Sequence, residues 1–176
     1  MSSPKVTNWS WQRSIPQFAV MAILMIVAYR IVPNITASRA MAIGAIAYLA
    51  YSLISRSILA RHHRLGIRAF REGHFGAAIG HYDQSIEFFE RYPWIDRFRA
   101  VTMMSPSAWS YREMGMLNKA FAESQNDNHE SAITGYEAVL KDYPDNEMAL
   151  QALKMLKTPN REGKQDVRGN ADPRST

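Results

Sequence analysis

The stretch Arg64–Pro93, RLGIRAFREGHFGAAIGHYDQSIEFFERYP, decides the predicted fold. Its pattern predicts two amphipathic helices separated by a stop near Gly73. Small residues at Gly66 and Ala78 would let the two helices approach closely, and Tyr82 would fill the space between this helix pair and the next. These residues are predicted to be architectural rather than functional.

A second copy of this pattern follows further along the chain. The stretch Ser131–Pro144, SAITGYEAVLKDYP, repeats the second helix of the first copy. Ala120 takes the small position of the preceding helix, and Asp127 with Asn128 takes the turn. Three residue pairs share one spacing of 54 residues: Gly66 and Ala120, Ala78 and Ala132, and Tyr82 and Tyr136.

Both copies resemble the tetratricopeptide repeat, a pair of antiparallel helices about 34 residues long. The observed spacing equals one such unit plus an insertion, which places the repeats at about 59–92 and 113–146 and the insertion at 93–112. The resemblance implies an all-α fold with a concave groove that binds a protein partner. Ordinary core packing is the alternative for each groove residue that the resemblance implies: Ile67, Phe70, Arg71, Leu117 and Phe121.

The remaining parts of the helical domain, 61–157, follow from shorter signals. Ser105 and Pro106 read as the start of a long helix, and 146–157 reads as a closing helix that Asp145 caps. The tail, 158–176, has no apolar stripe and is predicted to be disordered.

Before this domain, two apolar runs at Phe18–Tyr29 and Ala40–Ser55 predict a transmembrane helical hairpin over 15–60, after a polar N-terminus at 1–14. Each uncharged stretch is shorter than the roughly 20 residues that cross a bilayer. Arg30 and Arg39 lie at the turn, where their long side chains would carry the charges to the headgroups and lengthen the apolar span.

The flanking charges and aromatic residues predict the orientation of this hairpin. Lys5 and Arg13 precede it and several arginines follow it, so both termini are expected in the cytoplasm, with two spans in the cell inner membrane. Trp9 and Trp11 suit the cytoplasmic interface. Three alternatives remain: a pair of buried helices in a soluble bundle, a hairpin lying in one leaflet, and a cleaved signal peptide.

Small residues in the second span predict close helix packing. Ala40, Gly44 and Ala47 recur at helical spacing, so they would face the first span or, alternatively, a second copy of the chain. No glycine or proline lies between Ala45 and Leu65, which predicts one continuous helix from Ser38 to Glu72.

The insertion at 93–112 is unusually rich in large apolar residues for a connection, among them Trp94, Phe98 and Met103. We expect it to pack over the repeats. Contact with the membrane surface or with a partner protein is the alternative.

The composition of the chain argues against catalysis and metal binding. The chain of 176 residues has no cysteine, and its five histidines lack the paired spacing of a zinc site, so no metal, cofactor or catalytic residue is predicted. The net charge of +5 is explained by arginines beside the hairpin rather than by nucleic-acid binding. Glu113, Glu123 and Glu130 read as solvated helix charges.

The sequence therefore predicts a membrane-anchored adaptor for a protein partner. The alternatives are a structural subunit of a membrane complex, assembled through the hairpin, and a membrane enzyme using His74 or His81.

Overall fold

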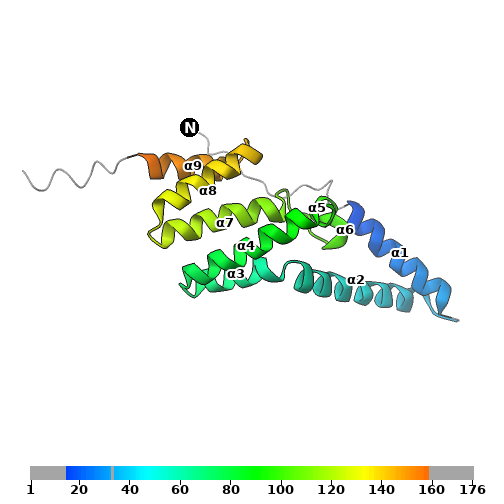
Figure 1. The fold of residues 1–176 in the computed structure, drawn as a ribbon. Helices are drawn as coiled ribbons and strands as arrows, with labels where there is room; N and C mark the ends of the chain where they lie inside the picture. The colour runs from blue at the N-terminus through cyan, green and yellow to red at the C-terminus, as the bar shows by residue number, and fades with distance from the viewer. Residues whose placement is uncertain (1–14, 33, 159–176) are drawn as a thin grey trace, which may run out of the picture.

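The computed structural model describes residues 15–32 and 34–158, and within these residues the chain is all-α (Figure 1). The predictions for the polar N-terminus, including Trp9 and Trp11, and for most of the tail fall outside these residues. The helices are α1 (Ile15–Ile31), α2 (Ala37–Leu59), α3 (Arg61–Arg71), α4 (Phe75–Arg91), α5 (Pro93–Arg97), α6 (Arg99–Thr102), α7 (Tyr111–Gln125), α8 (His129–Asp142) and α9 (Glu147–Lys157).

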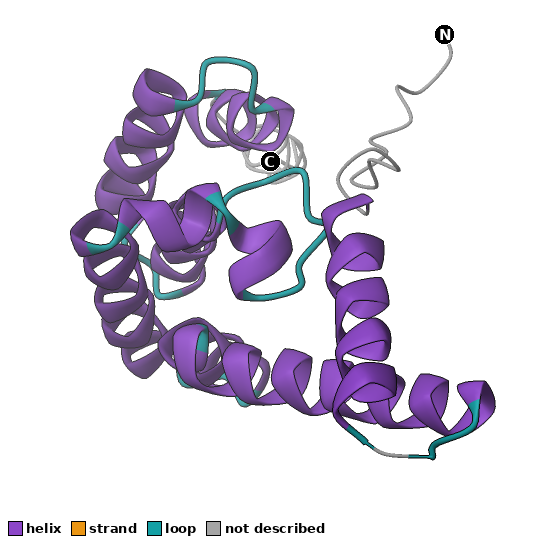
Figure 2. Cartoon of the chain, turned by 90° about the vertical axis from the view of Figure 1, so that its right-hand side faces the viewer, coloured by secondary structure: helices purple, strands orange, loops and turns teal. Residues whose placement is uncertain are grey.

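The helices form two parts. α1 and α2 pack together as a V with the turn at its point, and α3, α4, α7, α8 and α9 pack in succession as a curved stack of antiparallel helices (Figures 1 and 2). The short helices α5 and α6 lie at the open mouth of the V, where α6 contacts α1.

The two predicted copies have equivalent helices and turns. α4 and α8 begin 54 residues apart, and the turns before them have the same geometry. After α3, the His74 N–H bonds to the Ala69 carbonyl and Gly73 has a φ of 77°; after α7, the Asn128 N–H bonds to the Glu123 carbonyl and Asp127 has a φ of 58°. Both are Schellman endings. All six architectural residues are buried: Gly66, Ala78, Tyr82, Ala120, Ala132 and Tyr136.

Gly66 is required by a close approach between α3 and α4. A Cβ atom at this position would lie 2.6 Å from a ring carbon of Tyr82, which is itself only 2 % exposed. The second copy has a similar approach, because a Cβ at Gly135 on α8 would lie 2.9 Å from the Cβ of Ala120. Small residues therefore set the spacing of the helices in both pairs.

The predicted continuous helix from Ser38 to Glu72 is wrong at one residue. Ala60, with φ −101° and ψ 23°, separates α2 from α3. It is 2 % exposed and packs in a cluster with Phe89, Ile95 and Met103. Tertiary packing at this junction explains a break that no glycine or proline marks in the sequence.

The predicted helix starts in the second half of the domain are also corrected. α7 begins at Tyr111 rather than near Pro106, because the Ser110 hydroxyl accepts a hydrogen bond from the Glu113 N–H. Asn146 rather than Asp145 caps α9, accepting from the Ala149 N–H at 2.9 Å. Both caps follow the ordinary preference for a short polar side chain.

The insertion is folded, and one face of it packs against α4. Ile95 and Met103 are buried against Phe89 of α4. The Asp96 carboxylate accepts hydrogen bonds from the backbone N–H groups of Tyr111 and Arg112, at 2.9 and 3.0 Å, and so stabilises the N-terminus of α7.

Candidate functional site

The V formed by α1 and α2 has an apolar exterior. Its exposed large side chains cover both helices: Ile15, Phe18, Ile23, Ile26, Val27, Tyr29, Ile31, Met41, Ile43, Ile46, Leu49, Tyr51, Leu53, Ile54 and Ile58. A helix of a water-soluble protein normally turns such residues to the core and polar residues to solvent. This surface is therefore much more apolar than the ordinary exterior of a monomeric soluble protein.

Among the described residues, one helix is long and apolar enough to cross a membrane. It is α2, with 23 residues, a mean hydropathy of 1.5 in its most apolar window and only 17 % of that window buried. α1 is apolar but has 17 residues. By length, the structure supports one candidate span rather than the two that we predicted, because the described part of α1 is shorter than a typical bilayer core.

Ala40 and Gly44 lie in the contact between the two helices. Ala40 is 3 % exposed, and a Cβ at Gly44 would lie 2.6 Å from Cγ of Met25 on α1. Ala47 is exposed and lies outside this contact. The buried row continues instead at Ser52, so it follows a spacing of four residues along α2.

The five predicted groove residues do not form one surface. Phe70 on α3 and Phe121 on α7 meet, with ring centroids 5.1 Å apart, and Phe121 is 46 % exposed. Ile67 is half-buried against the core, and with the exposed Arg71, four residues further along α3, it lines a hollow of about 450 Å³. Leu117, at 6 % exposure, belongs to the core of the second copy. The predicted groove residues thus divide into an aromatic surface at Phe70 and Phe121, the hollow at Ile67 and Arg71, and a core residue.

A larger hollow lies elsewhere, between α4, α7 and α8. It encloses about 590 Å³ and none of the predicted groove residues lines it. We call it the α4–α7–α8 groove; its lining residues are Asp83, Ile86, Met116, Lys119, Ala120, Glu123, Glu130, Ser131, Thr134, Gly135 and Ala138. A volume of this size is within the range of ligand and peptide-side-chain pockets.

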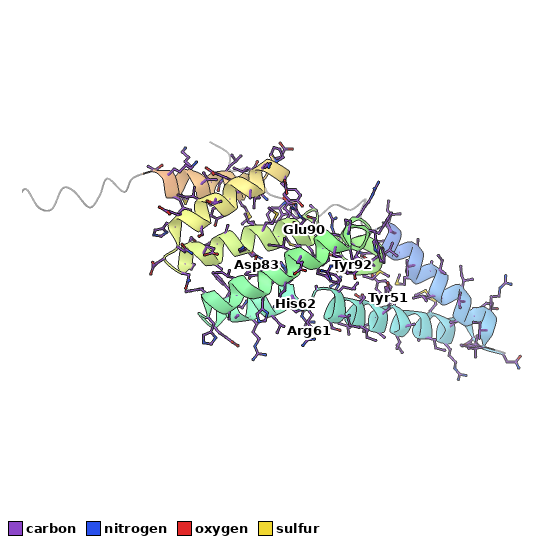
Figure 3. The ribbon with its side chains drawn as sticks, in the orientation of Figure 1. Tyr51, Arg61, His62, Asp83, Glu90 and Tyr92 are labelled. Atoms are coloured by element: carbon purple, nitrogen blue, oxygen red, sulfur yellow. The ribbon has the colours of Figure 1, made fainter. Side chains whose placement is uncertain are left out.

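The groove combines apolar side chains with charged side chains from all three helices. Lys119 of α7 lies 2.6 Å from a carboxylate oxygen of Asp83 on α4, which is labelled in Figure 3. Glu123 and Glu130 carry further negative charge on the lining. With three carboxylates against one ammonium group, the groove is electronegative. The sequence did not single it out, because its residues come from three helices.

Arg112 joins the two repeats at their other end. Its guanidinium contacts Glu90 of α4 at 2.9 Å and Asp142 of α8 at 2.7 Å, and also reaches the Tyr143 hydroxyl. Partial burial lowers the pKa of Arg112. The hydrogen bonds with Tyr143, Asp142 and Glu90 outweigh this effect and raise the pKa above its ordinary value. Arg112 therefore stays charged and fixes the stack.

The titratable side chains that were considered for catalysis or metal binding make contacts that hold the fold together. Within the described residues, no group of three potential metal ligands occurs. His63 is buried between the rings of Tyr82 and Tyr111. Glu113, predicted to be solvated, is buried and accepts a hydrogen bond from the Asn146 amide at 2.9 Å. That bond ties α7 to the cap of α9.

The rings of His62 and His81 lie 6.4 Å apart, while His74 is exposed and pairs with Glu72 at 3.7 Å. These histidines do not come together with a nucleophile in the contacts observed.

Comparison of the chain with protein-family models, with curated proteins and with solved structures gave no match. The tetratricopeptide resemblance therefore remains a prediction that rests on residue spacing and helix geometry.

Proposed function

We propose that this protein is a membrane-anchored adaptor whose α1–α2 hairpin inserts in the bilayer and whose tetratricopeptide-like stack, α3 to α9, binds a protein partner at the cytoplasmic face. The observation that carries the proposal is the contrast between the two parts. The V exposes large apolar side chains along both of its helices, whereas the stack has a packed core and ion pairs that join neighbouring helices.

Insertion turn-first explains where the charges lie. Arg30 and Arg39 are exposed at the point of the V, and the next arginine, Arg56, lies at its mouth. At 1.5 Å per residue, α1 is about 26 Å long and α2 about 34 Å, against a bilayer core of about 30 Å. Tilting of α2 and extension of the Arg30 side chain would accommodate these lengths at small cost.

The anchor is tested by alkaline carbonate extraction of membranes, followed by protease treatment of sealed vesicles that carry a tag after the C-terminus. Retention in the pellet with cleavage only when the cytoplasmic face is exposed supports the proposal. Release into the supernatant overturns it. Because the chain lacks cysteine, an Asn34→Cys variant reports the turn. Labelling by an impermeant maleimide from the opposite side indicates two spans, and protection from both sides places the hairpin in one leaflet.

For the partner, we propose a segment that combines apolar with basic side chains and binds in the α4–α7–α8 groove. Ile86 and Met116 in the groove would contact the apolar side chains of the segment. Asp83, Glu123 and Glu130 would attract its basic side chains. The aromatic surface at Phe70 and Phe121 is the second candidate, because Phe121 is exposed on a different face of α7.

Co-purification in mild detergent separates these surfaces. Ala138 is exposed on the groove wall, so an Ala138→Trp variant should fill the groove and release the partner while the thermal unfolding of the chain stays unchanged. Phe121→Ala should keep the partner. Loss with Phe121→Ala alone assigns binding to the aromatic surface, and loss only with Gly44→Leu favours the structural-subunit alternative. A partner insensitive to all three variants overturns the adaptor.

A further inference from the structure

The mouth of the V is closed by α5 and α6, which are fixed there by specific hydrogen bonds. The Tyr51 hydroxyl of α2 donates to the carbonyl oxygens of Val101 and Thr102, at 3.3 Å each. The Arg56 guanidinium donates to the Met103 carbonyl at 2.8 Å and to that of Met104. α6 also contacts α1. Both arms of the hairpin therefore hold the same segment at the same end.

This segment has two apolar faces, and only one is used inside the protein. The inner face packs Ile95, 6 % exposed, and Met103, fully buried, against α4. The outer face leaves Trp94 and Phe98 each 57 % exposed and Val101 40 % exposed. Burying apolar surface is worth about 25 cal/mol per Å², so two large aromatic side chains left in water are a substantial cost.

The outer face lies next to the apolar surface of the hairpin. Tyr51 of α2 is exposed and itself bonds to α6, and Ile54, three residues further along α2, is exposed as well; Figure 3 shows Tyr51 beside the region of α5 and α6. In Figure 2, which looks at the molecule from the side of the hairpin, short helical turns lie between the arms of the V and the stack and face the viewer. The hairpin and the insertion are thus neighbours in the fold, and both leave large apolar side chains exposed.

A positive charge borders this face. The Arg97 guanidinium lies 5.9 Å from the centre of the Phe98 ring. Aromatic side chains bordered by arginine are typical of the headgroup region, where the ring reaches the acyl boundary and the cation stays with phosphate.

We propose that α5 and α6 rest in the cytoplasmic headgroup layer of the membrane, with Trp94, Phe98 and Val101 turned to the lipid and Arg97 on an anionic headgroup. This inference rests on the proposed membrane anchor and deepens it. It makes the insertion a third membrane contact, which would fix the orientation of the stack relative to the bilayer.

The test uses single cysteines in the full-length, otherwise cysteine-free chain. Phe98→Cys and Val101→Cys report the insertion, Ile46→Cys reports the middle of α2, and Met155→Cys reports α9; Ile46 and Met155 are 68 % and 76 % exposed in the structure. Each variant is spin-labelled and reconstituted in phosphatidylcholine–phosphatidylglycerol vesicles. The accessibility of each label to oxygen, which prefers lipid, is then compared with its accessibility to a water-soluble nickel chelate.

We expect the ratio of oxygen to nickel accessibility to be highest at residue 46 and lowest at residue 155. At residues 98 and 101 the ratio should be several-fold lower than at residue 46 but well above that at residue 155. If residues 98 and 101 match residue 155 while residue 46 is in lipid, the inference is overturned and the anchor stands. If residue 46 also matches residue 155, the anchor itself is overturned. The second reporter position keeps the result decisive if one variant fails to fold.

Discussion

Arg56, near the end of α2, donates a hydrogen bond to the backbone carbonyl of Met103, 47 residues further along the chain, at 2.8 Å. The same side chain reaches the next carbonyl, Met104, whose φ of 49° places it in the left-handed region. One cation therefore holds both the hairpin and the insertion at their junction.

Replacing this cation should loosen the junction. We expect Arg56→Gln to lower the free energy of unfolding of the stack by about 1–3 kcal/mol, because two carbonyls lose a charged donor. Urea unfolding in a fixed detergent measures it, and Arg61→Gln, at a neighbouring exposed arginine, should change the free energy by less than about 0.5 kcal/mol. Equal effects of the two substitutions would contradict the role of Arg56.

Replacing either of two glycines of the first copy by alanine should change the stability of the chain, in opposite directions. Gly66→Ala would push a methyl group against the Tyr82 ring, which is 2.6 Å away, and should destabilise the chain by about 1–3 kcal/mol. At Gly80 on α4 a Cβ meets nothing within 4 Å, so Gly80→Ala should stabilise the helix by about 0.5–1 kcal/mol. Thermal unfolding of the two variants beside the parent chain checks both signs. A stable Gly66→Ala variant would show that α3 and α4 are not closely packed.

The contact between α1 and α2 should depend on Gly44 and not on Ala47. Gly44→Val places new atoms against both the side chain and the backbone of Met25, at 2.6–2.8 Å from the Cβ alone, so the two helices must separate. Ala47→Val adds a side chain at an exposed position and should be tolerated. Limited proteolysis at the turn, compared between the two variants in detergent, measures the difference. Identical digestion rates would mean that the arms of the V do not pack through Gly44.

Stability should fall in acid because of His63. Burial lowers the pKa of His63 to about 4, against a weaker raising effect of the Asp96 charge, whereas the unfolded chain has the ordinary value of 6.5. Between these values the unfolded state binds the proton and the folded state does not. The contribution of this group is therefore complete above pH 6.5 and is lost towards pH 4, at about 1.4 kcal/mol per pH unit within the window.

Unfolding free energies at pH 7, 5.5 and 4.5 test this dependence. A His63→Gln variant should show a shallower slope than the parent chain, and His129→Gln, at an exposed position, should keep the parent slope. If His63→Gln and the parent chain have the same slope, the acid sensitivity comes from other groups.

The local part of the fold could be predicted from the sequence. Apolar periodicity gave the helices, and the spacing of Gly66, Ala78 and Tyr82 gave the pairing, because helix contacts need small residues at fixed intervals. The turn at Gly73 could also be predicted, because glycine adopts the left-handed conformation without strain and so ends a helix. These features depend on residues close together in the chain.

Contacts between distant residues were decided only by the tertiary structure. The break at Ala60 needs Phe89, Ile95 and Met103 to pack around it, and the start of α7 needs the Asp96 carboxylate. Leu117 was predicted to line a groove but packs in the core, and the α4–α7–α8 groove was not predicted. A single helix pattern shows which side chains share a face, but which face is covered depends on where the other helices pack. The sequence by itself determined the helices and their pairing, and the tertiary structure decided where they end, which apolar residues stay exposed and where the surface is hollow.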